Sequence, residues 1–232
     1  MKTYRHLFFD LDGTLWDFER NSEDTLKEIF PEFLKDFLWL YSLDEMLLIY
    51  HRINHSLWED YKKGIVSREE VSVNRFRLTL EQVCPGAVPC AGEMAEAYVK
   101  RSPTRTLLLP GALEVVGKLS EKYELHLITN GFPEVQVPKM ENAGLEPYFK
   151  TLTTSEECGC LKPCRRIFDY AMAKAGALPG LSLMIGDDPD GDIRGAMDAG
   201  MDAVYLYTGE NPPAVKALYT IHSLSELLKL LA

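Results

Sequence analysis

Short, largely apolar runs recur along the chain, bounded by polar residues or glycines. Each run is four or five residues long, which suits a strand better than a helix. Apolar side chains at consecutive positions are typical of strands that are buried on both faces, as in a parallel sheet. The runs lie at His6–Phe9, Leu125–Ile128, Thr151–Thr154, Leu181–Ile185 and Ala203–Leu206.

Stretches with apolar residues at helical spacing lie between these runs. The last of them, 223–231, opens with Ser223 and Glu226, whose spacing matches a capping box at the start of a helix. Strands that alternate with helices predict an α/β fold with a doubly wound parallel sheet and short connections. The other helical faces consist of Leu113, Val116 and Leu119, of Ile167, Tyr170, Ala171 and Ala175, and of Ile193, Ala196 and Ala199.

One long interval interrupts this alternation. Between 16 and 104 there is no strand pattern, and about 90 residues is long for a connection between a strand and a helix. Ser67 and Glu70 have capping-box spacing, which predicts the start of a helix in this interval. We therefore expect an α/β core made of 1–15 and 105–232, with an all-helical cap domain inserted over 16–104. The helical face that supports this expectation is Met46, Tyr50, Ile53, Leu57 and Tyr61.

Composition and charge narrow the range of partners. The chain has 232 residues, of which 46% are hydrophobic and 26% are charged, as in a globular protein. Its net charge of −10 repels nucleic-acid backbones and anionic membranes, so we expect neither as a partner. No segment approaches the roughly 20 apolar residues of a membrane helix, and the N-terminus lacks the features of a secretory signal. We therefore expect a cytoplasmic protein.

Polar groups follow the predicted strands. In an open α/β sheet, ligands bind beyond the carboxyl ends of the strands, so the residues after each run are candidates for chemistry. The first run is followed by a pair of aspartates, the second by a hydroxyl and an amide, the third at some distance by a lysine, and the fourth by several aspartates. These segments are Asp10-Leu11-Asp12-Gly13-Thr14, Thr129-Asn130-Gly131, Lys162-Pro163 and Gly186-Asp187 through Asp192.

This set of groups is what phosphoryl transfer requires. A carboxylate such as Asp10 attacks phosphorus only if the mutual negative charge is neutralised, which calls for a hard cation such as Mg²⁺ held by Asp10 and Asp187. Lys162 and Thr129 supply a positive charge and a donor for the phosphoryl oxygens. Asp12, two residues from Asp10, is placed to protonate the leaving alkoxide and then to activate water.

The four segments resemble, in order and spacing, the signature motifs of the haloacid dehalogenase superfamily, and the resemblance covers the whole chain. It implies a Rossmann-like core, magnesium-dependent chemistry on a small phosphorylated metabolite, and a helical cap that follows the first motif. By this resemblance Asp10 is the nucleophile and Asp12 is the acid and base. The resemblance also implies that phosphate is bound by Thr129, Asn130 and Lys162. It implies that Mg²⁺ is held by Asp10, Asp187 and the main-chain carbonyl of Asp12, with Asp192 as a supporting carboxylate.

The second aspartate also indicates the kind of substrate. Dehalogenases of this superfamily lack an equivalent of Asp12, because a halide leaving group needs no proton, so Asp12 favours a phosphate ester. The opening Asp10–Asp17 and the stretch Thr129–Phe132 are most similar to a bacterial group of pyrimidine 5′-nucleotidases. We therefore expect hydrolysis of a nucleoside 5′-monophosphate or another small phosphate ester. The alternatives are a sugar phosphomutase, a haloacid dehalogenase and a binding module without catalytic activity.

Overall fold

The computed structural model describes residues 3–36, 41–209 and 215–231. Two compact units make up the chain. One combines Met1–Phe18 with Thr106–Ala232, and the other is Glu19–Arg105. No helix in the described ranges is both long and apolar enough to cross a membrane.

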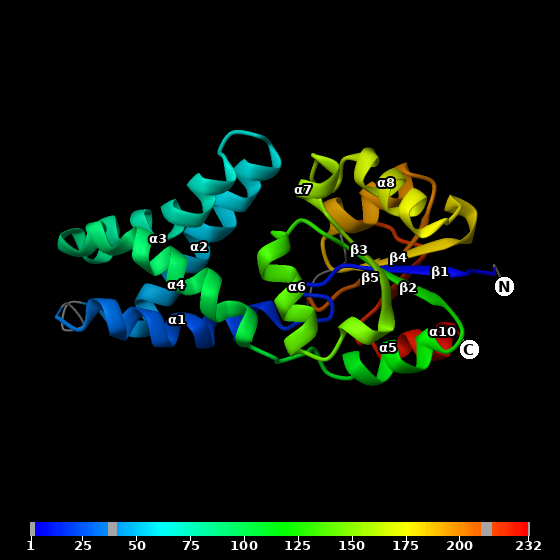
Figure 1. The fold of residues 1–232 in the computed structure, drawn as a ribbon, viewed down its shortest axis with the longest axis horizontal. Helices are drawn as coiled ribbons and strands as arrows, with labels where there is room; N and C mark the ends of the chain where they lie inside the picture. The colour runs from blue at the N-terminus through cyan, green and yellow to red at the C-terminus, as the bar shows by residue number, and fades with distance from the viewer. Residues whose placement is uncertain (1–2, 37–40, 210–214, 232) are drawn as a thin grey trace. The chain divides into compact units, whose positions relative to one another are not determined.

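The first unit is built around a parallel sheet (Figure 1). Six strands of the described chain pair in the order β3-β2-β1-β4-β5-β6, and each pair is parallel. The chain passes from β1 to β2 and β3 on one side and then to β4 on the other, so the topology switches between β1 and β4. The strands are β1 (His6–Phe9), β2 (Glu124–Thr129), β3 (Phe149–Thr154), β4 (Ser182–Gly186), β5 (Asp202–Leu206) and β6 (Tyr219–Ile221).

Both faces of this sheet are covered by helices, which confirms the doubly wound α/β fold predicted from the sequence (Figure 1). Leu7 and Phe9 of β1 belong to one apolar cluster with residues of α5 and α10, whereas Phe8 belongs to a second cluster with residues of α8 and α9. Successive side chains of a strand point to opposite faces, so burial on both faces explains the continuous apolar run. These helices are α5 (Ala112–Ser120), α8 (Arg165–Ala175), α9 (Gly195–Asp198) and α10 (Glu226–Leu230).

Helix α6 (Pro133–Asn142) and strand β6 are among the elements that were not predicted from the sequence. Helix α6 contains Pro133 in its first turn and Pro138 inside it, and this composition obscures the helical pattern. Strand β6 has three residues, of which two are exposed, so it lacks an apolar run. The structure also corrects three predicted apolar positions, because Leu113 is 44%, Tyr170 is 38% and Leu181 is 39% exposed. The unit also contains a short helix α7 (Ser155–Cys158), a π-helical turn over Pro189–Arg194, and 3-10 turns over Glu146–Tyr148 and Pro179–Leu181.

In the second unit, helices are the only regular elements among the described residues, and they share an apolar core of their own. The capping box predicted at Ser67 and Glu70 is confirmed, because each residue bonds the main-chain N–H of the other. Of the predicted helical face on α2, Met46 and Tyr50 are fully buried. The helices are α1 (Phe18–Leu34), which begins at the end of the first unit, α2 (Leu43–Lys62), α3 (Arg68–Val83) and α4 (Ala91–Arg101).

Candidate active site

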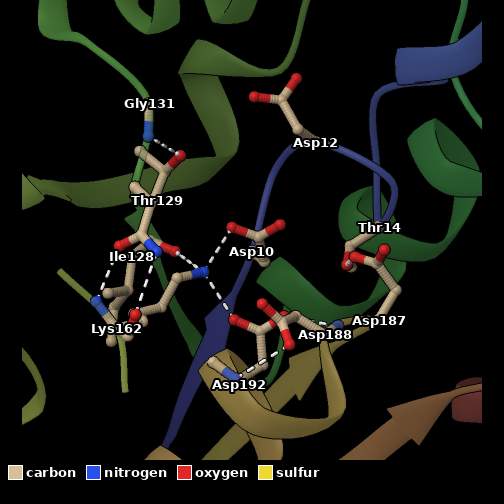
Figure 2. Close-up of polar contacts among 12 residues, drawn as sticks. Asp10, Asp12, Thr14, Ile128, Thr129, Gly131, Lys162, Asp187, Asp188 and Asp192 are labelled. Atoms are coloured by element: carbon tan, nitrogen blue, oxygen red, sulfur yellow. Dashed lines mark hydrogen bonds and ion pairs between the residues drawn. The ribbon is translucent and has the colours of Figure 1, made fainter. Parts of the chain in front are cut away.

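The carboxylate of Asp10 follows directly after β1 and contacts the ammonium group of Lys162 (Figure 2). Lys162 Nζ donates to Asp10 Oδ1 at 2.6 Å, to Asp192 Oδ1 at 2.5 Å and to the main-chain oxygen of Ile128 at 3.0 Å. The lysine is only 3% exposed, so its three N–H groups are engaged inside the protein. Burial alone would lower the pKa of Lys162, but the two carboxylates outweigh burial and hold this pKa above its ordinary value.

Three carboxylates gather around this single ammonium group. Ligand oxygens of Asp10, Asp187 and Asp192 lie within 4.8 Å of one another. Burial raises the pKa of Asp187 to about 7, and the nearby Asp192 adds to the increase. Burial likewise raises the pKa of Asp10 well above its ordinary value, although Lys162 opposes this shift. The cluster therefore has more carboxyl groups than one lysine can neutralise, and strongly shifted pKa values of this kind are typical of a functional site.

The loops after β1 and β4 are fixed to each other beside this cluster. Gly13 has a φ of 85°, and a Cβ atom at this position would overlap the carboxylate of Asp187. A glycine is therefore needed here for both its conformation and its lack of a side chain. Thr14 Oγ1 donates to Asp187 Oδ1 at 2.6 Å, and Asp192 Oδ2 accepts the N–H of Asp188 at 3.1 Å. The first bond ties Asp187 to the loop that carries Asp10, and the second holds Asp192 within the loop after β4.

Thr129 and Asn130, at the end of β2, have different surroundings. The hydroxyl of Thr129 accepts the main-chain N–H of Gly131 at 3.0 Å and Nε2 of Gln136 at 2.7 Å. The amide of Asn130 instead contacts the main chain of Lys162, with Nδ2 donating to its carbonyl at 3.2 Å and Oδ1 accepting its N–H at 2.7 Å. Asn130 thus holds the lysine in place, and its expected contact with phosphate stays a prediction.

Asp12 lies on the same loop as Asp10, but its carboxylate points away from Asp10 and Lys162 (Figure 2). Lys139 Nζ donates to Asp12 Oδ1 at 2.6 Å, and Gln136 Nε2 donates to Asp12 Oδ2 at 2.8 Å. The side chain of Asp12 therefore has partners of its own outside the carboxylate cluster. The metal contact expected of Asp12 involves its main-chain carbonyl and stays a prediction.

Neither Gln136 nor Lys139 was expected at the site from the sequence. Both lie on α6, which begins shortly after the segment Thr129-Asn130-Gly131. Gln136 is fully buried and Lys139 is 3% exposed, although the two residue types are usually found at the surface. The available signal was a glutamine and a lysine three residues apart, directly after a candidate phosphate-binding segment, and the prolines of α6 concealed their common face.

The donor set of the carboxylate cluster suits a hard divalent cation such as Mg²⁺, which prefers carboxylate oxygens. Lys162 donates to one carboxylate oxygen of Asp10, and Thr14 donates to one of Asp187. Among the described residues, the second oxygen of each carboxylate has no hydrogen bond. Both oxygens of Asp192 are engaged, by Lys162 and by a main-chain N–H. This arrangement favours Asp10 and Asp187 as metal ligands and Asp192 as the residue that supports Lys162.

A second group of potential ligands, His6, Glu124 and His126, lies near the amino ends of β1 and β2. His6 Nδ1 and His126 Nε2 are 3.2 Å apart and form a hydrogen bond, and His126 Nδ1 bonds the hydroxyl of Thr151 at 2.9 Å. Glu124 accepts from Arg5 Nε at 3.1 Å. Each member of this group has a partner within the protein, so we interpret the group as structural.

Comparison with known proteins adds a separate line of evidence. A family model described as haloacid dehalogenase-like hydrolase matches residues 4–200. The chain is 33% identical to the pyrimidine 5′-nucleotidase YjjG of Escherichia coli (strain K12), over 97% of this chain and 96% of that protein. It is 28% identical to the pyrimidine 5′-nucleotidase PynA of Streptococcus pneumoniae (strain ATCC BAA-255 / R6), over 97% and 94% of the two chains.

The same comparison extends to a solved structure. The crystal structure of the HAD-hydrolase YfnB from Bacillus subtilis, bound to magnesium, has a TM-score of 0.89 against this chain. The two chains are 28% identical, and the alignment covers 99% of each.

Proposed function

The chain belongs to the haloacid dehalogenase-like hydrolases, and on this basis we propose that it is a magnesium-dependent phosphatase that acts through an aspartyl-phosphate on Asp10. The observation that carries the proposal is the buried cluster in which Lys162 bridges Asp10 and Asp192 beside Asp187. Such a cluster pairs a candidate nucleophile with a cation that a phosphoryl oxygen can also contact.

In the first step an oxygen of Asp10 forms a bond to phosphorus while the ester P–O bond breaks. The leaving oxygen keeps the electron pair of that bond and takes a proton from the carboxyl group of Asp12. Lys162 and the hydroxyl of Thr129 donate to the phosphoryl oxygens, where negative charge must be stabilised. The products of this step are the free alcohol and a phosphoryl group on Asp10.

In the second step water attacks phosphorus and gives a proton to the carboxylate of Asp12. The bond between phosphorus and Asp10 breaks, so both aspartates return to their starting forms and inorganic phosphate is released. The raised pKa of Asp10 reflects burial beside other carboxylates, and a nearby cation would favour its ionised, nucleophilic form.

Mg²⁺ fits the donor set described above, with Asp10, Asp187 and the main-chain carbonyl of Asp12 as the residues that would hold it. When bound, it supplies positive charge that offsets the repulsion between the carboxylates and a dianionic ester. Thr14 and Gly13 set the position of Asp187, and Asn130 sets that of Lys162.

For the substrate we propose a nucleoside 5′-monophosphate, because two relatives that align over nearly the whole chain are pyrimidine 5′-nucleotidases. We assign the role of the cap to the helical unit Glu19–Arg105, which has its own apolar core and can therefore act as one body. A cap of this kind selects the leaving group and limits the access of water during the reaction.

The test is phosphate release from pyrimidine and purine nucleoside 5′-monophosphates, sugar phosphates and p-nitrophenyl phosphate, with Mg²⁺ or with a chelator. We expect turnover that requires Mg²⁺ and a higher kcat/KM for pyrimidine nucleotides. Acid quenching followed by mass spectrometry should find one added phosphoryl group on the peptide that contains Asp10. Asp10→Asn is the matched control, with turnover lower by at least about 10³-fold and an unchanged circular dichroism spectrum.

The same assay separates the alternatives. Activity that depends on a sugar bisphosphate would indicate a phosphomutase, and halide release from a haloacid would indicate a dehalogenase. Turnover of none of these compounds would indicate a binding module. Magnesium-dependent turnover that survives Asp10→Asn would contradict the assignment of the nucleophile.

A further inference from the structure

Helix α6 presents two buried polar side chains that the mechanism above does not use. Gln136 and Lys139 are three residues apart, so they lie on one face of the helix. Lys139 Nζ is 2.6 Å from Asp12 Oδ1, and Gln136 Nε2 is 2.8 Å from Asp12 Oδ2. Each oxygen of the Asp12 carboxylate therefore has its own donor, and the rotation of the carboxylate is fixed.

The ammonium group of Lys139 is itself held in place. It lies 3.9 Å from the ring centre of Trp16 and 5.8 Å from that of Phe18. An ammonium over an aromatic face is attracted to it, and more strongly where water is excluded. Trp16 is fully buried in the apolar core of the first unit, so it offers a rigid support for the lysine.

Gln136 links Asp12 to the phosphate-binding end of β2. Its Nε2 atom has two hydrogens, of which one is donated to Asp12 and the other to Thr129 Oγ1 at 2.7 Å. Within the described part of the chain, Thr129 Oγ1 accepts both of its hydrogen bonds, from Gln136 and from the N–H of Gly131. The hydroxyl hydrogen of Thr129 is thereby left for another acceptor, such as a phosphoryl oxygen.

The orientation of the Gln136 amide has an energetic cost. Its Oε1 atom is buried and has no hydrogen-bond partner among the described residues. An unsatisfied buried acceptor costs about 1–3 kcal/mol. The reverse orientation would place Oε1 against the carboxylate of Asp12, where two acceptors repel each other. The observed orientation therefore keeps the hydrogen bonds from Nε2 to Asp12 and Thr129 and leaves Oε1 without one.

The direction of the Asp12 side chain suits the leaving group. In phosphoryl transfer the attacking and leaving oxygens lie roughly in line on opposite sides of phosphorus. An acid that serves the leaving oxygen must therefore lie away from the nucleophile, and the carboxylate of Asp12 points away from Asp10 (Figure 2). One donor on each carboxylate oxygen still leaves a second lone pair there for the transferred proton.

We propose that Lys139 and Gln136 are positioning residues, which hold the carboxylate of Asp12 for proton transfer to the leaving oxygen. Gln136 also directs the hydroxyl of Thr129 toward the phosphoryl group. This inference rests on the phosphatase function proposed above and adds to it the residues that orient the acid and base.

The test compares two esters with different needs for an acid. A nucleoside 5′-monophosphate releases an alkoxide that must be protonated, whereas p-nitrophenyl phosphate releases a stable phenolate. The ratio kcat/KM covers the steps up to departure of the leaving group. We expect Lys139→Met to lower kcat/KM for the nucleotide at least about tenfold more than for the aryl ester. Lys139→Arg, which keeps the charge, should recover part of the loss.

Two further variants assign the effects to Asp12 and to Thr129. In an Asp12→Asn background, Lys139→Met should change kcat/KM for the nucleotide by less than about threefold, because the effects of residues that act together are not additive. Gln136→Leu should raise KM for both esters, since the phosphate-binding hydroxyl loses its orientation, and Lys139→Met should leave KM for the aryl ester nearly unchanged.

Equal losses of kcat/KM on both esters with Lys139→Met would make Lys139 merely structural and overturn the positioning role. A selective gain on the nucleotide would also overturn it, because Lys139 would then hold Asp12 out of the reaction. Absence of magnesium-dependent turnover of both esters by the unmodified protein would instead contradict the phosphatase function itself.

Discussion

Strands β1 and β2 bury polar side chains at both of their ends, and the two ends differ in how charge is balanced. Near the amino ends, His6 and His126 are hydrogen bonded to each other at 3.2 Å. Burial lowers the pKa of His126 to about 4, with His6 adding to the decrease, so the ring is neutral at pH 7. Near the carboxyl ends, the carboxyl groups of Asp10, Asp187 and Asp192 gather around the single ammonium group of Lys162.

The difference separates a structural polar group from the candidate active site. At the amino end, burial keeps the ring of His126 neutral and both of its nitrogens are hydrogen bonded, which is the usual condition of polar groups in a core. At the carboxyl end, the pKa values of the carboxylates are raised because they are buried together without enough positive charge. A site that gains a cation and a substrate during its function starts from such an imbalance.

Among the variants considered, removal of the Lys162 ammonium group should cause the largest loss of stability, because it acts on the end of the strands where charge is least balanced. Lys162→Met leaves Asp10 and Asp192 buried without their ammonium partner, and loss of one member of a buried ion pair costs about 3–5 kcal/mol. We expect the free energy of unfolding at pH 7, measured by urea titration without divalent metal, to fall by this amount. Phosphatase activity should fall by at least about 10²-fold as well.

The matched control is Lys118→Met on the surface of α5. Lys118 pairs with Glu114 at 2.5 Å, but its side chain is 57% exposed, so solvent screens this pair and we expect its loss to change stability little. Equal losses of stability in the two variants would contradict the prediction that the buried ammonium group of Lys162 contributes more to stability than an exposed one.

The pH dependence of the free energy of unfolding should also distinguish the two ends of the strands, and we expect its change to be of intermediate size. The folded-state pKa of Asp187 is raised to about 7, so the folded protein binds a proton there more tightly than the unfolded chain. This contribution to stability is complete below about pH 4 and is lost as the pH rises to about 7, with a slope of at most about 1.4 kcal/mol per pH unit.

Asp187→Asn removes this contribution. Urea titrations of the metal-free proteins between pH 4 and 7 should find the variant gaining stability relative to the unmodified protein as the pH rises. Mg²⁺ should stabilise the unmodified protein at pH 7 and the variant much less. A stability difference that is constant across this range would contradict the raised pKa of Asp187.

The smallest effect is expected at the amino end. His126→Gln removes a buried ring that stacks on Phe8 at 4.7 Å and bonds His6, so we expect a loss of about 1–2 kcal/mol at pH 7. The folded-state pKa of His126 is lowered, so its contribution is present above about pH 6.5 and is lost as the pH falls toward 4. The loss caused by the variant should therefore shrink at pH 5.

Activity distinguishes this variant from those at the carboxyl end. With His126→Gln, kcat/KM at pH 7.5 should stay within about twofold of the unmodified value, because His126 belongs to the structural group. A large loss of activity without a loss of stability would contradict that interpretation.

The sequence predicted the parallel sheet and the edge at which the polar residues gather. The carboxyl ends of parallel strands meet at one edge, so residues such as Asp10 and Asp187, which follow separate apolar runs, were expected to lie close together. The structure brings them within 4.8 Å, together with Asp192. The order of strands and the residues that follow them were sufficient for this prediction.

The partners of Asp12 could not be predicted in the same way. Gln136 and Lys139 lie 124 and 127 residues from Asp12 along the chain, and no local spacing encodes a contact at such a separation. The helix that carries them contains two prolines, which conceal its period. Asn130 gives a similar case, because its residue type suits both phosphate binding and the contact that it makes with the main chain of Lys162.

The fully occupied ammonium group of Lys162 has a consequence for inhibition by inorganic phosphate. The three N–H groups already have three acceptors, Asp10, Asp192 and the carbonyl of Ile128. A phosphate oxygen can therefore bind the lysine only by replacing one of these acceptors. The net gain in binding free energy is then the difference between the new hydrogen bond to phosphate and the hydrogen bond that is lost. For the phosphatase proposed above, we therefore expect the phosphate product to bind weakly and to leave readily.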